Sequence, residues 1–215
     1  MEIITSIIDF ILHIDKHLSE IISNYQIWTY LILFIIIFAE TGLVVTPFLP
    51  GDSLLFAAGA LIGAGDTGLN IYLLAVLLFI AAVLGDLVNY EIGKHYGIKV
   101  FNGKIKFLKK EYLTRTQDFF AKHGGKTIIY ARFVPIVRTF APFVAGVGEM
   151  TYKRFASFNV IGGFIWVVLF LFLGYFFGNL EFIQKNFSLV ILAIIVISVL
   201  PALVEVFRGG KKKEA

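Results

Sequence analysis

Long apolar runs separated by short polar segments dominate this sequence. Residues 71–93, 155–178 and 187–207 are each long enough to cross a bilayer as one helix, which takes about 20 residues. Of the 215 residues, 58% are hydrophobic and only 16% are charged, whereas a soluble domain needs more charge to cover its surface. We therefore expect an all-α integral membrane protein that forms a single membrane domain over residues 1–215.

Two further apolar stretches, residues 27–62 and residues 127–148, are interrupted by residues that break helices. These breaks are Pro47, Pro50, Gly51, Pro135, Pro142 and Gly146. Residues 27–62 are too many for one crossing and too few for two. Irregular backbone at membrane depth is tolerated where it is buried in protein or lines a wet cavity. We predict that each stretch is a re-entrant hairpin, which enters and leaves the membrane on the same side.

An amphipathic segment precedes each interrupted stretch, and a clean span follows it. Residues 1–24 place isoleucines at helical spacing between charged residues, which predicts a helix in the membrane interface. Residues 98–123 form a basic amphipathic segment. The order of amphipathic helix, hairpin and span therefore occurs twice, and residues 187–207 add a final span. Matching interruptions in two halves predict a repeat with a transporter binding site at its interface.

Lysine and arginine residues set the expected orientation. They cluster between Lys94 and Lys126 and again at Lys211–Lys213, and such clusters favour the cytoplasmic side. With both clusters inside, one of the intervening apolar segments cannot cross, and residues 127–148 are the candidate. Residues 63–70 then lie outside, the C-terminus is cytoplasmic and the two halves are inverted. The first helix would lie on the outer face, but a full crossing by residues 27–46 would move the N-terminus inside.

Ionisable residues at membrane depth are the candidate functional groups. Glu40 and Asp52 lie in the first interrupted stretch, and Arg132 and Arg138 lie in the second. A charge at this depth costs several kcal/mol unless it is paired or neutralised, and arginine keeps its proton. If the hairpin tips meet, the acids and arginines can pair there. Such residues mark ion or substrate paths by default, and the alternative is a lock that pins the hairpins together without transport.

A transport mechanism follows from these residue types. Arg132 and Arg138 suit a phosphate or another anion, because guanidinium donors match phosphate oxygens in bidentate fashion. Helix N-termini after Gly51 and after Pro142 would add oriented N–H groups. Burial disfavours the charged form of a carboxylic acid, so Glu40 and Asp52 are expected to exchange protons near neutral pH. Protonation of an acid would free its arginine for a substrate phosphate, which gives proton-coupled anion exchange.

Weaker signals come from the other apolar segments. The span 71–93 carries the polar residues Asp86, Asn89 and Tyr90. Two interpretations of these residues are possible: a packing contact with a hairpin or a role in the transport pathway. Glycine pairs with GxxxG spacing more often indicate close packing within one bundle than dimerisation. These pairs are Gly59/Gly63, Gly93/Gly97 and Gly174/Gly178.

Several kinds of site are not indicated. The sequence has no Ser/His/Asp set, no dinucleotide fingerprint and no cysteine, and the pair His13 and His17 lacks a third metal ligand. We therefore expect no catalytic residues, no cofactor and no metal. The basic segments are typical of membrane flanks, so nucleic acid is not expected as a partner.

Motifs along nearly the whole chain resemble the bacterial DedA family, whose VTT domain also occurs in eukaryotic lipid scramblases. The motifs are Glu40-Thr-Gly, Pro47-Phe-Leu-Pro50-Gly51-Asp52-Ser, Gly85-Asp86, Asn89-Tyr90, Gly93, Lys122-His-Gly-Gly125-Lys, Arg132-Phe-Val-Pro135 and Arg138-Thr-Phe-Ala-Pro142. The resemblance implies a bacterial inner-membrane protein with two opposed re-entrant hairpins and a role in envelope maintenance that depends on proton motive force. Some members are implicated in returning undecaprenyl phosphate across the membrane or in flipping phospholipids. The acidic and arginine residues that matter in the family match Glu40, Asp52, Arg132 and Arg138.

The resulting prediction is a proton-motive-force-dependent transporter or lipid flippase, with membrane lipids and protons as partners. A cation/proton antiporter, with Glu40 and Asp52 as the cation site, is one alternative. A structural envelope protein without turnover is another. The substrate, the stoichiometry, the direction and the formation of a homo-oligomer are left open.

Overall fold

The computed structural model describes residues 14–25, 27–43, 51–65, 67–99, 120, 123–178, 180–186, 189, 190 and 192–194. Every regular element in these ranges is helical, which confirms the predicted all-α class. The elements are α2 (Ile14–Tyr25), α3 (Trp28–Gly42), α4 (Gly51–Ala64), α5 (Ile71–Lys99), the 3-10 turn η2 (Gly124–Lys126), α7 (Thr127–Ala131), α8 (Pro135–Val144), the π-helical turn η3 (Ala145–Glu149), α9 (Tyr152–Phe177) and α10 (Glu181–Lys185).

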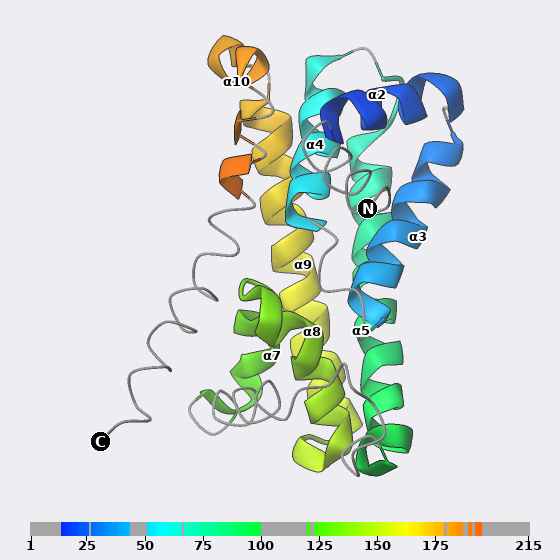
Figure 1. Ribbon diagram of the computed structural model, residues 1–215, viewed down its shortest axis with the longest axis vertical. Helices are drawn as coiled ribbons and strands as arrows, with labels where there is room; N and C mark the ends of the chain where they lie inside the picture. Colours follow the sequence, from blue (N-terminus) through cyan, green and yellow to red (C-terminus); the bar gives the residue numbers. More distant parts are fainter. Residues whose placement is uncertain are drawn as a thin grey trace, which may run out of the picture.

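Two long helices, α5 and α9, form the axis of the molecule (Figure 1). Residues Ile71–Tyr96 and Tyr152–Phe177 are long and apolar enough to cross a membrane, and they are the only such helices among the described residues. At about 1.5 Å per residue each reaches about 39 Å, more than the roughly 30 Å of a bilayer core. The side chain of Asn70 caps the start of α5 by accepting the N–H groups of Tyr72 and Leu73, at 2.9 and 3.1 Å.

Short helices lie in pairs at the two ends of this axis (Figure 1). The first pair is α3 and α4, of 15 and 14 residues, each about 22 Å long and too short to cross alone. In it, α3 packs against α5 and α4 packs against α9. The second pair is α7 and α8, followed by η3; here α7 packs against α9, while α8 and η3 pack against α5. Each short pair therefore contacts both long helices.

Glycines allow these helices to approach closely. Gly59 and Gly63 of α4 lie against the backbone of α9, while Gly174 of α9 and Gly178 at its end lie against α4. A Cβ atom at any of these positions would collide with the facing helix. The GxxxG pairs of the two helices therefore serve packing within one chain, which is the use that the sequence favoured.

The second pair of short helices differs in detail from the predicted breaks. Pro135 begins α8, at a position where the missing proline N–H costs nothing, and Gly146 lies in η3. Pro142 was predicted as a break with a helix N-terminus after it, but it lies inside α8. The π-helical turn η3 begins three residues after this proline and contains Gly148 at φ 124°. The helix N-terminus of this segment is therefore at Pro135.

Large apolar side chains cover the outer faces of the long helices. Exposed examples are Tyr72, Leu73, Val76, Ile80, Leu84 and Val88 on α5, and Ile161, Phe164, Ile165, Leu169, Leu173 and Phe176 on α9. A soluble monomer rarely exposes so much contiguous apolar surface, whereas lipid contact requires it. Polar and charged side chains such as Asp86, Asn89 and Asn159 are buried instead.

Some predicted segments lie wholly or partly outside the described residues. These are most of 98–123, the turn with Pro47 and Pro50, and most of the final span 187–207. Of the predicted interfacial segment 1–24, the described part is α2, which lies across the end of the first short pair (Figure 1). Its Leu18 and Ile22 are buried in the core shared with α4.

Candidate functional site

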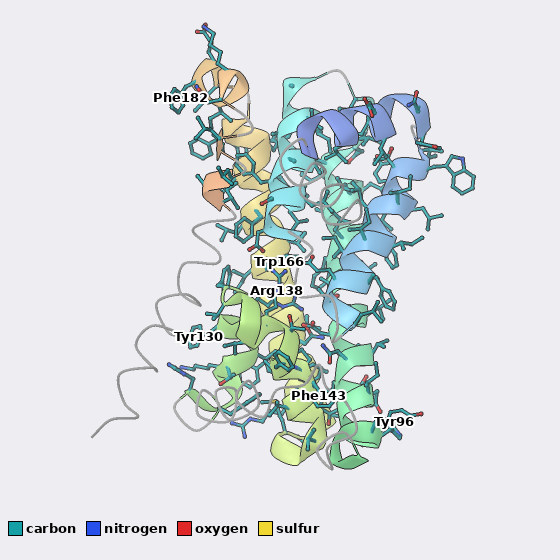
Figure 2. The ribbon with its side chains drawn as sticks, in the orientation of Figure 1. Tyr96, Tyr130, Arg138, Phe143, Trp166 and Phe182 are labelled. Carbon is teal, nitrogen blue, oxygen red and sulfur yellow. The ribbon has the colours of Figure 1, made fainter. Side chains whose placement is uncertain are left out.

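Arg138 of α8 joins the two short helix pairs through ion pairs with both acids of the first pair. Its Nη1 atom lies 2.8 Å from Oδ1 of Asp52, and its Nη2 atom contacts Oε1 of Glu40. The side chains of Arg138, Glu40 and Asp52 expose only 13%, 2% and 10% of their surfaces. The structure therefore brings three of the four predicted charged residues into one buried cluster, at mid-height in Figure 2.

Glu40 lies near the end of α3, and its side chain reaches the N-terminus of α4. The backbone N–H of Gly51, the first residue of α4, donates to Oε1 of Glu40 at 3.1 Å. An anion at this position is favoured, because the first N–H groups of a helix lack intrahelical acceptors. A Cβ atom at position 51 would collide with the Glu40 carboxylate, so glycine there lets the carboxylate approach the backbone of α4. The second oxygen of Glu40, Oε2, is buried without a hydrogen-bond partner among the described residues.

Arg132, in the turn after α7, has different partners from those predicted. Its Nη2 atom lies 2.6 Å from Oδ2 of Asp86 on α5 and 2.6 Å from Oδ1 of Asn159 on α9. Gly162 and Gly163 of α9 leave room for the guanidinium group, since a Cβ at either position would come within 3.3 Å of it. Arg132 thus ties the two long helices together. Its Nε and Nη1 atoms are buried without a partner in the part of the chain that the structure describes.

The polar residues of α5 contact both short pairs. Asn89 donates from Nδ2 to the carbonyl oxygens of Thr41 in α3, at 3.2 Å, and Thr139 in α8, at 3.0 Å. Tyr90 donates its hydroxyl to the carbonyl of Met150, at 3.1 Å, and its ring stacks on Phe155. Asn89 and Tyr90 therefore make packing contacts within the bundle, whereas Asp86 forms the ion pair with Arg132.

Trp166 of α9 was missed by the sequence analysis. Its Nε1 atom donates to Oδ1 of Asp52 at 2.7 Å, and its ring centroid lies 5.1 Å from the guanidinium carbon of Arg138 and 5.8 Å from that of Arg132. Figure 2 shows Trp166 and Arg138 adjacent at the centre of the molecule. A signal did exist, because Asn159, Gly162, Gly163 and Trp166 follow the i, i+3, i+4, i+7 spacing of one helix face.

A metal centre finds no support in the described residues, which contain no group of three or more His, Cys, Asp or Glu side chains able to hold an ion. The pair His13 and His17 lies outside the side chains that the structure describes. The chemistry available at this site is therefore that of carboxylates, guanidinium groups, amides and one indole.

Comparisons with known proteins agree with these observations. The VTT domain matches residues 49–176, which include Asp52, Asp86, both arginines and Trp166. Protein DedA of Escherichia coli (strain K12) is 57% identical over 97% of this chain and 95% of its own length. An uncharacterized membrane protein of Mycobacterium tuberculosis (strain ATCC 25618 / H37Rv) is 46% identical over 82% of this chain and 78% of its own.

A more distant relative is Inner membrane protein YqjA of Escherichia coli (strain K12), which is 38% identical over 70% of this chain and 68% of its own length. No solved structure matches the chain. The extent of the VTT domain and the identity to DedA over nearly the full length are decisive: this chain belongs to the DedA family of VTT-domain membrane proteins.

Proposed function

We propose that this protein is a proton-motive-force-dependent transporter or flippase that moves a phosphate-bearing lipid across the bacterial inner membrane. The observation that carries the proposal is the contact of Arg138 with Glu40 and Asp52, buried where the two short helix pairs meet. Ionisable groups at membrane depth mark substrate or ion pathways by default. The relative named Inner membrane protein YqjA supports the choice of membrane.

The packing of the helices supports an inverted repeat of re-entrant hairpins. In each half, the first short helix packs on the long helix of its own half, as α3 does on α5 and α7 does on α9. The second short helix packs on the long helix of the other half, as α4 does on α9 and α8 does on α5. This exchange is the pattern expected of two similar halves related by a two-fold axis in the membrane plane, with the binding site between them.

The partners of Glu40 suit a phosphate group. Its carboxylate contacts the guanidinium of Arg138 and the N–H of Gly51 at the start of α4. A guanidinium and a helix N-terminus are the two groups that proteins commonly use for phosphate oxygens. Glu40 therefore occupies the position of an anionic substrate, and both donors become available when the carboxylate is neutralised.

A cycle follows in which a proton and a phosphate compete for Glu40 and Arg138. Protonation of Glu40 from the outer side weakens its ion pair, and Arg138 then binds the lipid phosphate instead. Loss of the proton on the inner side restores the carboxylate, which displaces the phosphate from Arg138. Asp52 is the second acid that contacts Arg138, and the apolar outer faces of α5 and α9 leave the lipid chains in the bilayer. No covalent step is required, so the proposal includes no enzymatic activity.

A reconstitution experiment tests the proposal. Purified protein in liposomes should move labelled undecaprenyl phosphate or labelled phosphatidylethanolamine between leaflets, and the faster of the two identifies the lipid class. Arg138→Ala should abolish movement, whereas Arg154→Ala, at an exposed arginine of α9, should leave it unchanged. Equal lipid movement by wild type and Arg138→Ala would contradict the proposal, as would a proton flux driven by cations without any lipid movement.

A further inference from the structure

Trp166 lies against both groups of charged residues, the Glu40–Asp52–Arg138 cluster and the Arg132–Asp86 pair. It is fully buried and is the largest side chain in that condition among the described residues. Its indole N–H reaches Oδ1 of Asp52 at 2.7 Å, and Arg138 reaches the same oxygen at 2.8 Å. Two donors from two different helices therefore converge on one carboxylate oxygen, which fixes the orientation of Asp52 toward Arg138.

The indole ring also limits where the arginines can lie. The guanidinium carbons of Arg138 and Arg132 are 5.1 and 5.8 Å from the ring centroid, within the range of cation–π attraction. Arg132 is in addition held by Asn159, which lies on the same face of α9 as Trp166. This face of α9 therefore positions Arg132, Arg138 and Asp52 between the two halves of the molecule.

We infer that Trp166 is a positioning residue that holds Asp52 against Arg138 and thereby sets the pH at which the contact opens. The inference rests on the proposed function. An indole N–H can donate but cannot accept, and a hydrogen bond to a carboxylate is stronger than one to a neutral acid. Trp166 therefore stabilises the closed, ion-paired state.

Several charged side chains of the described residues lie near Asp52 or near the Trp166 ring. Among them are Arg138 from α8 and Glu40 from α3, with the Arg132–Asp86 pair next to the same indole. Residues 44–50, which precede α4, contain no titratable side chain. Asp52 and Glu40 are therefore the two acids of this set that contact Arg138.

Trp166→Phe separates positioning from packing, because it keeps an aromatic ring and removes only the N–H donor. In liposomes the alkaline limb of the pH–rate profile should move to higher pH by about one unit, since a hydrogen bond to a charged group contributes on the order of tenfold to the equilibrium. The apparent KM for the lipid should not change. A profile identical to that of wild type would overturn the inference, and so would a rate lowered equally at every pH, which indicates packing alone.

Fluorescence provides a readout that does not depend on transport. The chain has two tryptophans, and Trp28 lies exposed at the start of α3, so Trp28→Phe leaves Trp166 as the only reporter. Emission of the Trp28→Phe variant should change with pH through a single midpoint, and adding Asp52→Asn should remove that change.

The two readouts distinguish the two proposals. If wild type moves no lipid, the proposed function fails, while a pH-dependent emission that Asp52→Asn abolishes still supports the role of Trp166. Emission that does not respond to pH or to Asp52→Asn overturns the inference even if lipid movement is normal.

Discussion

Arg132 and Arg138 lie six positions apart in one segment, yet they pair with different residues in the structure. Arg138 contacts the acids of the opposite half, whereas Arg132 is held between α5 and α9 by Asp86 and Asn159. From sequence, the charges of the two interrupted stretches are complementary, which indicates that they meet. The choice of partner depends on the break before Pro135, which changes the direction of the chain between the two arginines. Residue spacing cannot predict that change.

Trp166 and Asn159 show a different limit of the sequence. A tryptophan or a single asparagine in an apolar span is usually explained by interface anchoring or by helix packing. Only the shared helix face with Gly162 and Gly163 distinguishes these two residues, and its meaning depends on knowing that an arginine lies against that face.

Substitution of Glu40 tests proton coupling at a single residue. Glu40→Gln keeps the shape of the side chain but cannot lose a proton, so Arg138 is held by Asp52 alone. We expect lipid movement that an imposed pH gradient no longer accelerates, measured as rates with and without the gradient in proteoliposomes. Glu181→Gln, at an exposed acid of α10, is the matched control and should respond as wild type does. Acceleration of Glu40→Gln equal to that of wild type contradicts the coupling role.

Removal of Arg132 should affect stability more directly than any other single change at the site. Arg132→Ala leaves Asp86 buried without its cation, and breaking a buried pair in this way costs about 3–5 kcal/mol. Arg132→Met combined with Asp86→Asn removes both charges and should recover most of the loss. Denaturant unfolding of the purified protein in detergent measures both effects. An Arg132→Ala variant as stable as wild type would show that Arg132 does not tie α5 to α9.

At the scale of elements, the sequence predicted which segments are interrupted, but it did not predict every residue at which a helix ends or begins. Pro135 begins a helix, as proline readily does, but Pro142 is carried inside α8. A proline within a helix removes one hydrogen bond, yet α8 continues through Pro142 to Val144 and is followed by the π-helical turn η3. η3 packs against α5, and no local sequence pattern predicts that tertiary contact.

The glycine contact between α4 and α9 offers a test at this scale. Gly174→Val places a branched side chain against the backbone of α4 at Phe56, so the two helices must separate. We expect a loss of about 1–3 kcal/mol in unfolding free energy, as for other overpacked cores. Leu173→Val, at the neighbouring exposed position, is the control and should change stability little. Unchanged stability of Gly174→Val would contradict the close approach of these helices.

At the scale of the whole molecule, two short helix pairs at opposite ends of a two-helix axis account for the membrane fold and for the position of the charges (Figure 1). Hydropathy predicted the spans 71–93 and 155–178, which correspond to α5 and α9, whereas most of the third predicted span, 187–207, lies outside the described residues. The sequence could not predict how each short helix is shared between the long helices, because that sharing is a tertiary property set by the glycine contacts.

Cysteine labelling tests the expected topology without a preparatory variant, because the chain contains no cysteine. Ala64→Cys, at the end of α4, should react with a membrane-impermeant maleimide in intact spheroplasts, which leave the outer face of the inner membrane open to the reagent. Lys153→Cys, at the start of α9, should react only after the membrane is permeabilised. Both positions are exposed in the structure. Labelling of both from the same side would contradict the inverted arrangement of the two halves.

The most direct test of the central claim is lipid movement by a variant in which Arg138 and both acids that pair with it are replaced, so that no charge of this cluster is left unpaired. Glu40→Gln and Asp52→Asn with Arg138→Met retain approximate shape and leave no buried charge unpaired in this cluster, so the protein should fold and reconstitute as wild type does. If the pair serves transport, this variant moves no labelled lipid phosphate between leaflets under an imposed proton gradient. If it moves the lipid at the wild-type rate, the pair is only a lock between the two halves, and a transport role for Glu40 and Arg138 is wrong.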